Sequence, residues 1–117
     1  MNFNKKNFSK TAVIGLDVED WYHLDYLSEK EKSIDISMLD GFDIIMQILN
    51  QNNCKATLFV VGEIINLMKT KILEASNNGY EIGSHGYTHK RPLLMSNGEF
   101  IDEITKTKEI LENLVNK

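Results

Sequence analysis

Two kinds of hydrophobic pattern alternate along this chain. Short apolar runs rich in β-branched residues occupy residues 11–16 and 55–61 and are typical of buried strands, and residues 80–83 predict a third, shorter strand. Apolar residues recur at helical spacing over residues 38–49 and 63–76, and again from residue 96 to the end of the chain. The pattern therefore predicts three strands, each followed by a helix.

Local signals mark the ends of two of these helices. Residues 77–79 read Asn-Asn-Gly and are typical of a left-handed helix C-cap. Ser96 and Glu99 have the spacing of a capping box, which marks a helix start. Residues 18–36, by contrast, are aromatic and charged without a regular period, which indicates a functional loop rather than a simple connector.

Alternating strands and helices are typical of parallel α/β architecture, with the helices outside the sheet. We expect one domain over residues 1–117, because this length leaves no room for a second core. In such folds, ligands bind at the carboxyl ends of the strands. Asp17 and His85 follow the first and third predicted strands, so we expect them to face the same rim.

The composition argues against several partners and locations. The formal net charge is -4, and the Lys and Arg residues are scattered, so we expect no binding to nucleic acid or to an anionic membrane surface. The apolar run after the N-terminal lysines is too short for a signal peptide or a membrane span, so the expected location is cytoplasmic. Cys54 is the single cysteine, so no internal disulfide is expected.

The residues with the clearest chemistry are two histidines and a group of carboxylates. His85 and His89 are four residues apart, and the nearby glycines let the backbone bend so that both imidazoles reach one ion. The acidic group Asp17, Glu19 and Asp20 can supply one carboxylate to the ion and another as a general base. The competing interpretations are solvated histidines and an acidic loop or helix cap. Metal-assisted hydrolysis is the chemistry that the combination favours.

Three segments together resemble a known family. Residues 17–23 read DVEDWYH, residues 55–62 read KATLFVVG and residues 79–89 read GYEIGSHGYTH. In this order and at this spacing they resemble the polysaccharide deacetylases of carbohydrate esterase family 4. The D-x-E-D-W form is most similar to the branch associated with exopolysaccharide synthesis.

The resemblance implies a deformed (β/α) barrel that removes acetyl groups from N-acetylated polysaccharides or oligosaccharides with a divalent metal, commonly Zn²⁺. His85 and His89 match the metal ligands, and Asp17 matches the general base. Asp20 is our first choice as the third ligand, and Glu19 is the alternative. Four further residues in the same two loops are candidates for stacking on sugar rings or lining their site: Trp21, Tyr22, His23 and Tyr87. For Trp21 and Tyr22, capping of the core is the competing interpretation. Gly86 departs from the family's usual Ser or Thr, which leaves the loop with one hydrogen bond fewer.

The chain also lacks the later segments of the family, including its Arg-Pro-containing loop and the late Leu-x-His whose histidine acts as general acid. It therefore resembles the N-terminal half of a deacetylase, a partial barrel truncated on its C-terminal side. An open sheet edge implies either a partner that supplies the C-terminal half or self-association. The alternative function is a noncatalytic α/β remnant, or a module that binds metal or carbohydrate.

Overall fold

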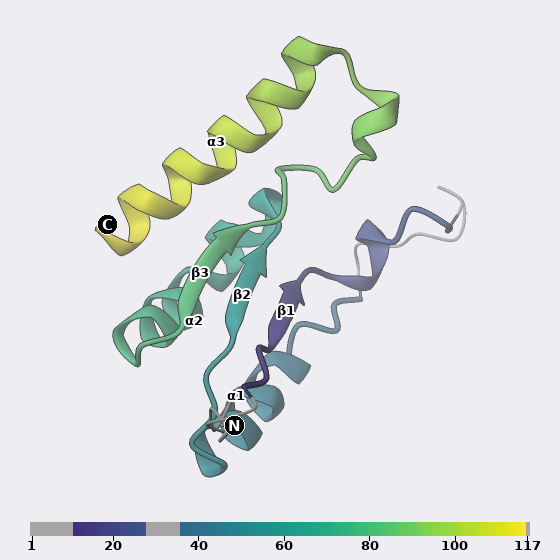
Figure 1. The fold of residues 1–117 in the computed structure, drawn as a ribbon. Helices are drawn as coiled ribbons and strands as arrows, with labels where there is room; N and C mark the ends of the chain where they lie inside the picture. The colour runs from purple at the N-terminus through teal and green to yellow at the C-terminus, as the bar shows by residue number, and fades with distance from the viewer. Residues whose placement is uncertain (1–10, 28–35, 117) are drawn as a thin grey trace, which may run out of the picture.

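The computed structural model describes residues 11–27 and 36–116, and its centre is a parallel sheet (Figure 1). The strands are β1 (Gly15–Val18), β2 (Thr57–Val60) and β3 (Glu81–Ser84), in the order β1-β2-β3. The helices are α1 (Gly41–Gln51), α2 (Ile65–Asn77) and α3 (Asn97–Val115). Short 3-10 turns lie at Trp21–His23, Gly62–Ile64 and Pro92–Leu94. The predicted α/β alternation is confirmed.

The two faces of the sheet differ because side chains alternate along each strand. In β2, Leu58 and Val60 are fully buried with the helices, and each such side chain contributes roughly 1.5–3 kcal/mol of burial free energy. Phe59 points to the other face and remains 37% exposed. Its ring lies over Gly15 and Gly83 on the flanking strands, where a Cβ atom would come within 3.2 and 2.9 Å of it.

The last helix, α3, packs along β3 and against α2 (Figure 1). Its predicted capping box is confirmed: the Glu99 amide donates to Ser96 Oγ, and the Ser96 amide donates to Glu99 Oε2. Thr107 and Leu111 are the buried residues of α3, and they mark the side of the helix that packs against the rest of the protein. Gly79, after α2, has the left-handed conformation that the sequence predicted, with φ 83°.

The first strand differs from its prediction. It begins at Gly15 rather than at residue 11, so Asp17 lies within the strand. The reason is pairing, because β2 is the only neighbour of β1 among the described residues and its register with β1 starts at Gly15 opposite Thr57. Of the predicted loop over 18–36, residues 28–35 lie outside the described residues. No helix in the described ranges is long and apolar enough to cross a membrane.

Candidate metal centre

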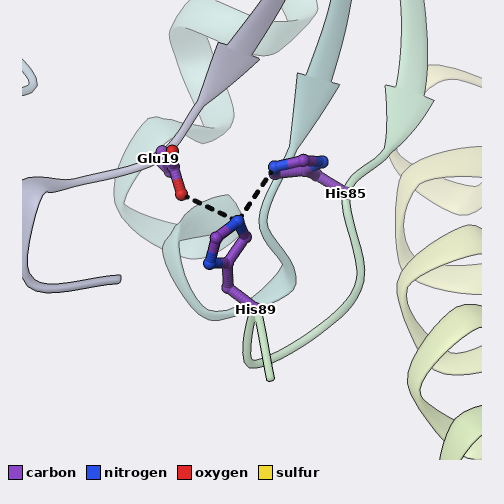
Figure 2. A group of neighbouring side chains, drawn as sticks. All are labelled: Glu19, His85 and His89. Atoms are coloured by element: carbon purple, nitrogen blue, oxygen red, sulfur yellow. Dashed lines mark hydrogen bonds and ion pairs between the residues drawn. The ribbon is translucent and has the colours of Figure 1, made fainter. Parts of the chain in front are cut away.

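A cluster of three side chains lies at the carboxyl edge of the sheet (Figure 2). Val18 on β1 and Ser84 on β3 both align with Val60 on β2. Glu19 and His85 are the residues that follow these aligned positions, and they therefore flank the end of β2. His89 reaches the same point from the loop after β3 (Figure 2).

The distances within the cluster suit one metal ion. Nε2 of His89 lies 3.1 Å from Nε2 of His85 and 3.2 Å from Oε2 of Glu19, and the three ligand atoms all lie within 4.8 Å of one another. Bonds of 2.0–2.1 Å to a tetrahedral zinc ion would separate ligand atoms by roughly 3.3 Å. The two distances to His89 are close to this value, and three protein ligands leave one coordination position open.

The hydrogen bonding of His89 fixes which of its nitrogens faces the cluster. Its Nδ1 lies 2.9 Å from the backbone carbonyl of His23. Because a carbonyl only accepts, Nδ1 is the donor, and in the neutral ring Nε2 then has the lone pair that a metal ion needs. Metal-binding histidines usually coordinate the ion through one ring nitrogen and donate the N–H of the other to a carboxylate, a backbone carbonyl or water.

The carboxylate of Glu19 provides a test of whether a cation fits. Its Oε2 is buried and accepts no hydrogen bond from the described residues, although it lies 3.2 Å from His89 Nε2. A buried carboxylate oxygen without a donor is costly. A divalent cation between Glu19 and the two imidazoles would remove that cost, so the donor set fits the metal that the resemblance implies.

Asp17 lies beside this cluster rather than in it. Its Oδ2 is 3.8 Å from His85 Nε2, and its side chain is 56% exposed. A carboxylate at this place is open to solvent and close to the candidate ion. The geometry is compatible with the general-base role, which stays a prediction.

Asp20, our first choice as third ligand, is placed elsewhere by the structure. Its side chain is buried, and Oδ1 accepts from the amides of Trp21 and Met38 at 2.9 and 3.0 Å. Its Oδ2 accepts from Ser37 Oγ at 2.5 Å. Asp20 therefore caps the turn at Trp21–His23 and connects it to the segment before α1. The carboxylate that lies with the two histidines is that of Glu19, the alternative third ligand predicted from the sequence.

Matched carboxamide variants separate these two carboxylates. Glu19→Gln removes a charged ligand atom and is expected to weaken zinc binding at least ~10-fold. Asp20→Asn keeps zinc affinity but lowers the free energy of unfolding by about 1 kcal/mol, because hydrogen bonds to a charged acceptor become neutral ones. Zinc titration and urea unfolding of both variants measure the two effects. Loss of zinc from Asp20→Asn alone would reverse the assignment.

Two of the predicted sugar-contacting residues line a cleft of about 860 Å³ beside His89. Tyr22 and His23 lie on its wall, with their ring centroids 4.5 Å apart. Burial raises the pKa of Tyr22, and the nearby Asp20 and Glu63 carboxylates raise it further, so its phenol stays a hydrogen-bond donor. The predicted contact of Tyr22 and His23 with sugar remains untested.

The other two aromatic candidates have structural contacts outside this cleft. The Trp21 indole N–H donates to the Ile36 carbonyl at 2.7 Å. The Tyr87 ring packs against Gly62, and the Lys106 ammonium lies 3.3 Å from the centre of the ring. Their roles in sugar binding remain predictions.

Sequence reasoning missed one polar pair in the cleft. His23 is buried, its Nδ1 accepts from the Asp20 amide at 3.0 Å, and its Nε2 therefore carries the proton. That Nε2 lies 3.4 Å from Oε2 of Glu63, on the turn after β2. No local sequence signal joins residues 40 positions apart, although both follow predicted strands.

A comparison with protein families matches residues 33–117 to the family described as polysaccharide deacetylase. A peptidoglycan-N-acetylglucosamine deacetylase from Bacillus cereus is 36% identical over 80 residues, which cover 64% of this chain and 29% of the relative. The chain thus spans less than a third of that protein's length.

Solved structures show the same fold. A peptidoglycan deacetylase from Bacillus subtilis matches with a TM-score of 0.69 and 18% identity, over 90% of this chain and 44% of that one. A pseudoenzyme of carbohydrate esterase family 4 from Bacillus anthracis matches with a TM-score of 0.68 and 22% identity, over 90% and 31% of the two chains. At these identities the likeness concerns the fold, which is the (β/α) architecture expected from the sequence.

Proposed function

This chain belongs to the polysaccharide deacetylase family, and we propose that it binds one divalent cation, preferably zinc, and takes part in hydrolysing N-acetyl groups on polysaccharides. The observation that carries the proposal is the cluster of Glu19, His85 and His89 with Asp17 beside it. A zinc ion held there supplies a Lewis acid, which polarises an acetamide carbonyl and makes water more acidic.

The residues of this chain have separate tasks in that reaction. His85, His89 and Glu19 hold the cation at the end of the sheet, and the His23 carbonyl orients His89. Asp17 takes the proton of the attacking water, because it is the exposed carboxylate next to the cluster. The cleft lined by Tyr22 and His23 lies beside His89, where it would receive the sugar.

The proposed substrate is an N-acetylhexosamine unit within a polymer. The B. cereus relative is named for peptidoglycan N-acetylglucosamine, whereas residues 17–21 are most similar to the exopolysaccharide branch. Acetate release from peptidoglycan, from chito-oligosaccharides and from an N-acetylated exopolysaccharide would distinguish these polymers.

The test of activity uses the chain alone and a chimera. We expect the zinc-loaded chain alone to release little acetate, since none of its residues matches the histidine that serves as general acid in the family it resembles. A chimera in which residues 11–117 replace the matching region of the B. cereus relative is expected to release acetate. In that chimera, Asp17→Asn should lower turnover by about 10²–10⁴-fold while zinc stays bound.

A noncatalytic metal or carbohydrate module is the second candidate, and one observation favours it. The chain has three histidines, of which two lie in the cluster and the third, His23, is buried near Glu63. Arg91, the single arginine, is ion-paired with Asp25. The histidines and the arginine of this chain therefore already have other contacts, and none matches the general acid or the arginine of the family. A chimera that binds zinc but releases no acetate would favour this candidate over the enzyme.

A further inference from the structure

The loop that joins the two histidines has an unusual backbone. Gly86 and His89 both lie in the left-handed region, with φ of 76° and 61°. Glycine adopts this conformation freely, but for histidine it is unfavourable and persists only where the surroundings enforce it. The loop after β3 therefore needs contacts that hold it in place (Figure 2).

The amides of Gly62 and Glu63 donate to the loop carbonyls of Gly86 and Tyr87 at 2.9 and 3.0 Å, and one side chain on α3 supplies three further hydrogen bonds. Oε2 of Glu103 accepts from the amides of Tyr87 and Thr88 at 2.8 and 2.9 Å. Oε1 accepts from Thr88 Oγ1 at 2.8 Å. The two carboxylate oxygens thus bind two consecutive residues between His85 and His89.

The charge of Glu103 strengthens this arrangement. Burial raises the pKa of its carboxyl, but the hydrogen bonds from Thr88 and Tyr87 and the nearby Lys106 outweigh burial and lower the pKa below its ordinary value. Hydrogen bonds to a charged acceptor are roughly twice as strong as neutral ones. Thr107, one turn further along α3, is fully buried, so this side of the helix packs against the rest of the protein close to Glu103.

We propose that Glu103 is a positioning residue that holds the His85–His89 loop so that both Nε2 atoms face one point before any ion binds. Glu103 acts on the ligands only through Tyr87 and Thr88. The proposal deepens the proposed function, because it rests on the metal role of the two histidines.

The test compares zinc affinity and loop structure in three variants of the full chain. Glu103→Ala removes all three hydrogen bonds and is expected to weaken zinc binding by about 10–100-fold. Glu103→Gln should stay within a few-fold of wild type, since its carbonyl can accept from both amides and its NH₂ can donate to Thr88 Oγ1. Glu109→Ala, which removes an exposed carboxylate from the same helix, is the control and should leave zinc affinity unchanged.

A second readout needs neither zinc nor activity. In the metal-free protein, NMR is expected to show proton contacts between the His85 and His89 rings, whose centroids lie 4.8 Å apart. Glu103→Ala should lose these contacts and exchange the Tyr87 and Thr88 amide protons faster, while Glu103→Gln and Glu109→Ala keep the wild-type pattern. Thr88→Val removes one of the three hydrogen bonds to Glu103, together with the 3.4 Å hydrogen bond from the Lys90 amide to Thr88 Oγ1. It should show a smaller loss and serves if Glu103→Ala does not fold.

The outcomes separate this proposal from the proposed function. If wild type binds no zinc, the metal role fails, but loss of the ring contacts in Glu103→Ala still supports the positioning role. Wild-type ring contacts and wild-type zinc affinity in Glu103→Ala would overturn the proposal. An equal loss in Glu103→Gln and Glu103→Ala would overturn it too, because the hydrogen bonds would then not be the cause.

Discussion

Replacing either histidine of the cluster, as His85→Ala or His89→Ala, is expected to abolish stoichiometric zinc binding. Each change removes one of three protein ligands and leaves a two-residue set, which binds zinc too weakly to fill at micromolar concentration. We expect wild type to hold about one zinc per chain and each variant to bind at least ~100-fold more weakly. Metal analysis after gel filtration and competition with a chromophoric chelator measure both quantities.

The third histidine provides the control for this result. His23→Gln changes a histidine outside the cluster and keeps the backbone carbonyl that accepts from His89. It is expected to keep about one zinc per chain. Equal zinc contents in wild type and in the His85→Ala/His89→Ala double variant would contradict the metal centre altogether.

Gly62→Ala is expected to cause the largest loss of stability, about 3 kcal/mol in the free energy of unfolding. A Cβ atom at this position would lie 2.3 Å from Cδ2 and 2.8 Å from Cα of Tyr87, and 2.8 Å from Thr107 Oγ1. The Gly62 amide also donates to the Gly86 carbonyl at 2.9 Å. Because backbone atoms of the histidine loop are among the clashing atoms, no side-chain rotation relieves the overlap.

The control is a glycine with free space around it. Gly98 lies in the first turn of α3, and nothing lies within 4 Å of a Cβ atom built there. Gly98→Ala is expected to be neutral or to stabilise by up to about 1 kcal/mol. Urea unfolding of both variants gives the comparison, and equal stability would mean that the contact between Gly62 and Tyr87 does not constrain the loop.

Most of the fold could be predicted because it is encoded in local patterns. Helical spacing of apolar residues located α1, α2 and α3 to within a few residues, and Gly79 and the pair Ser96 and Glu99 marked two helix ends. The start of β1 was missed because strand ends depend on the neighbouring strand, and Thr57 supplies that neighbour only from Gly15 onward.

The sequence was enough to identify the residues of the candidate site, but not which carboxylate contacts the two histidines. Both histidines and the acidic segment were identified from sequence, whereas Glu19 rather than Asp20 meets the histidines. Strand alternation carried beyond Val18 would have indicated this, since Val18 and Asp20 are buried whereas Glu19 between them is partly exposed. The burial of Asp20 depends on Ser37 and Met38, which only the folded chain brings to it.

Glu103 was missed for a related reason. It lies 15 residues from Thr88, and nothing in a helical pattern distinguishes a carboxylate that reaches a loop from one that faces water. The left-handed backbone of His89 is equally invisible in sequence, because only glycine and asparagine normally signal that conformation.

Trp21 is the single tryptophan of the chain, two residues from Glu19, and its indole is tied to the Ile36 carbonyl. All tryptophan fluorescence of the unlabelled protein therefore originates two residues along the chain from the candidate ligand. Titration with a cation can be followed through the intensity and wavelength of that emission, which gives an optical reporter of the β1 end without any added dye.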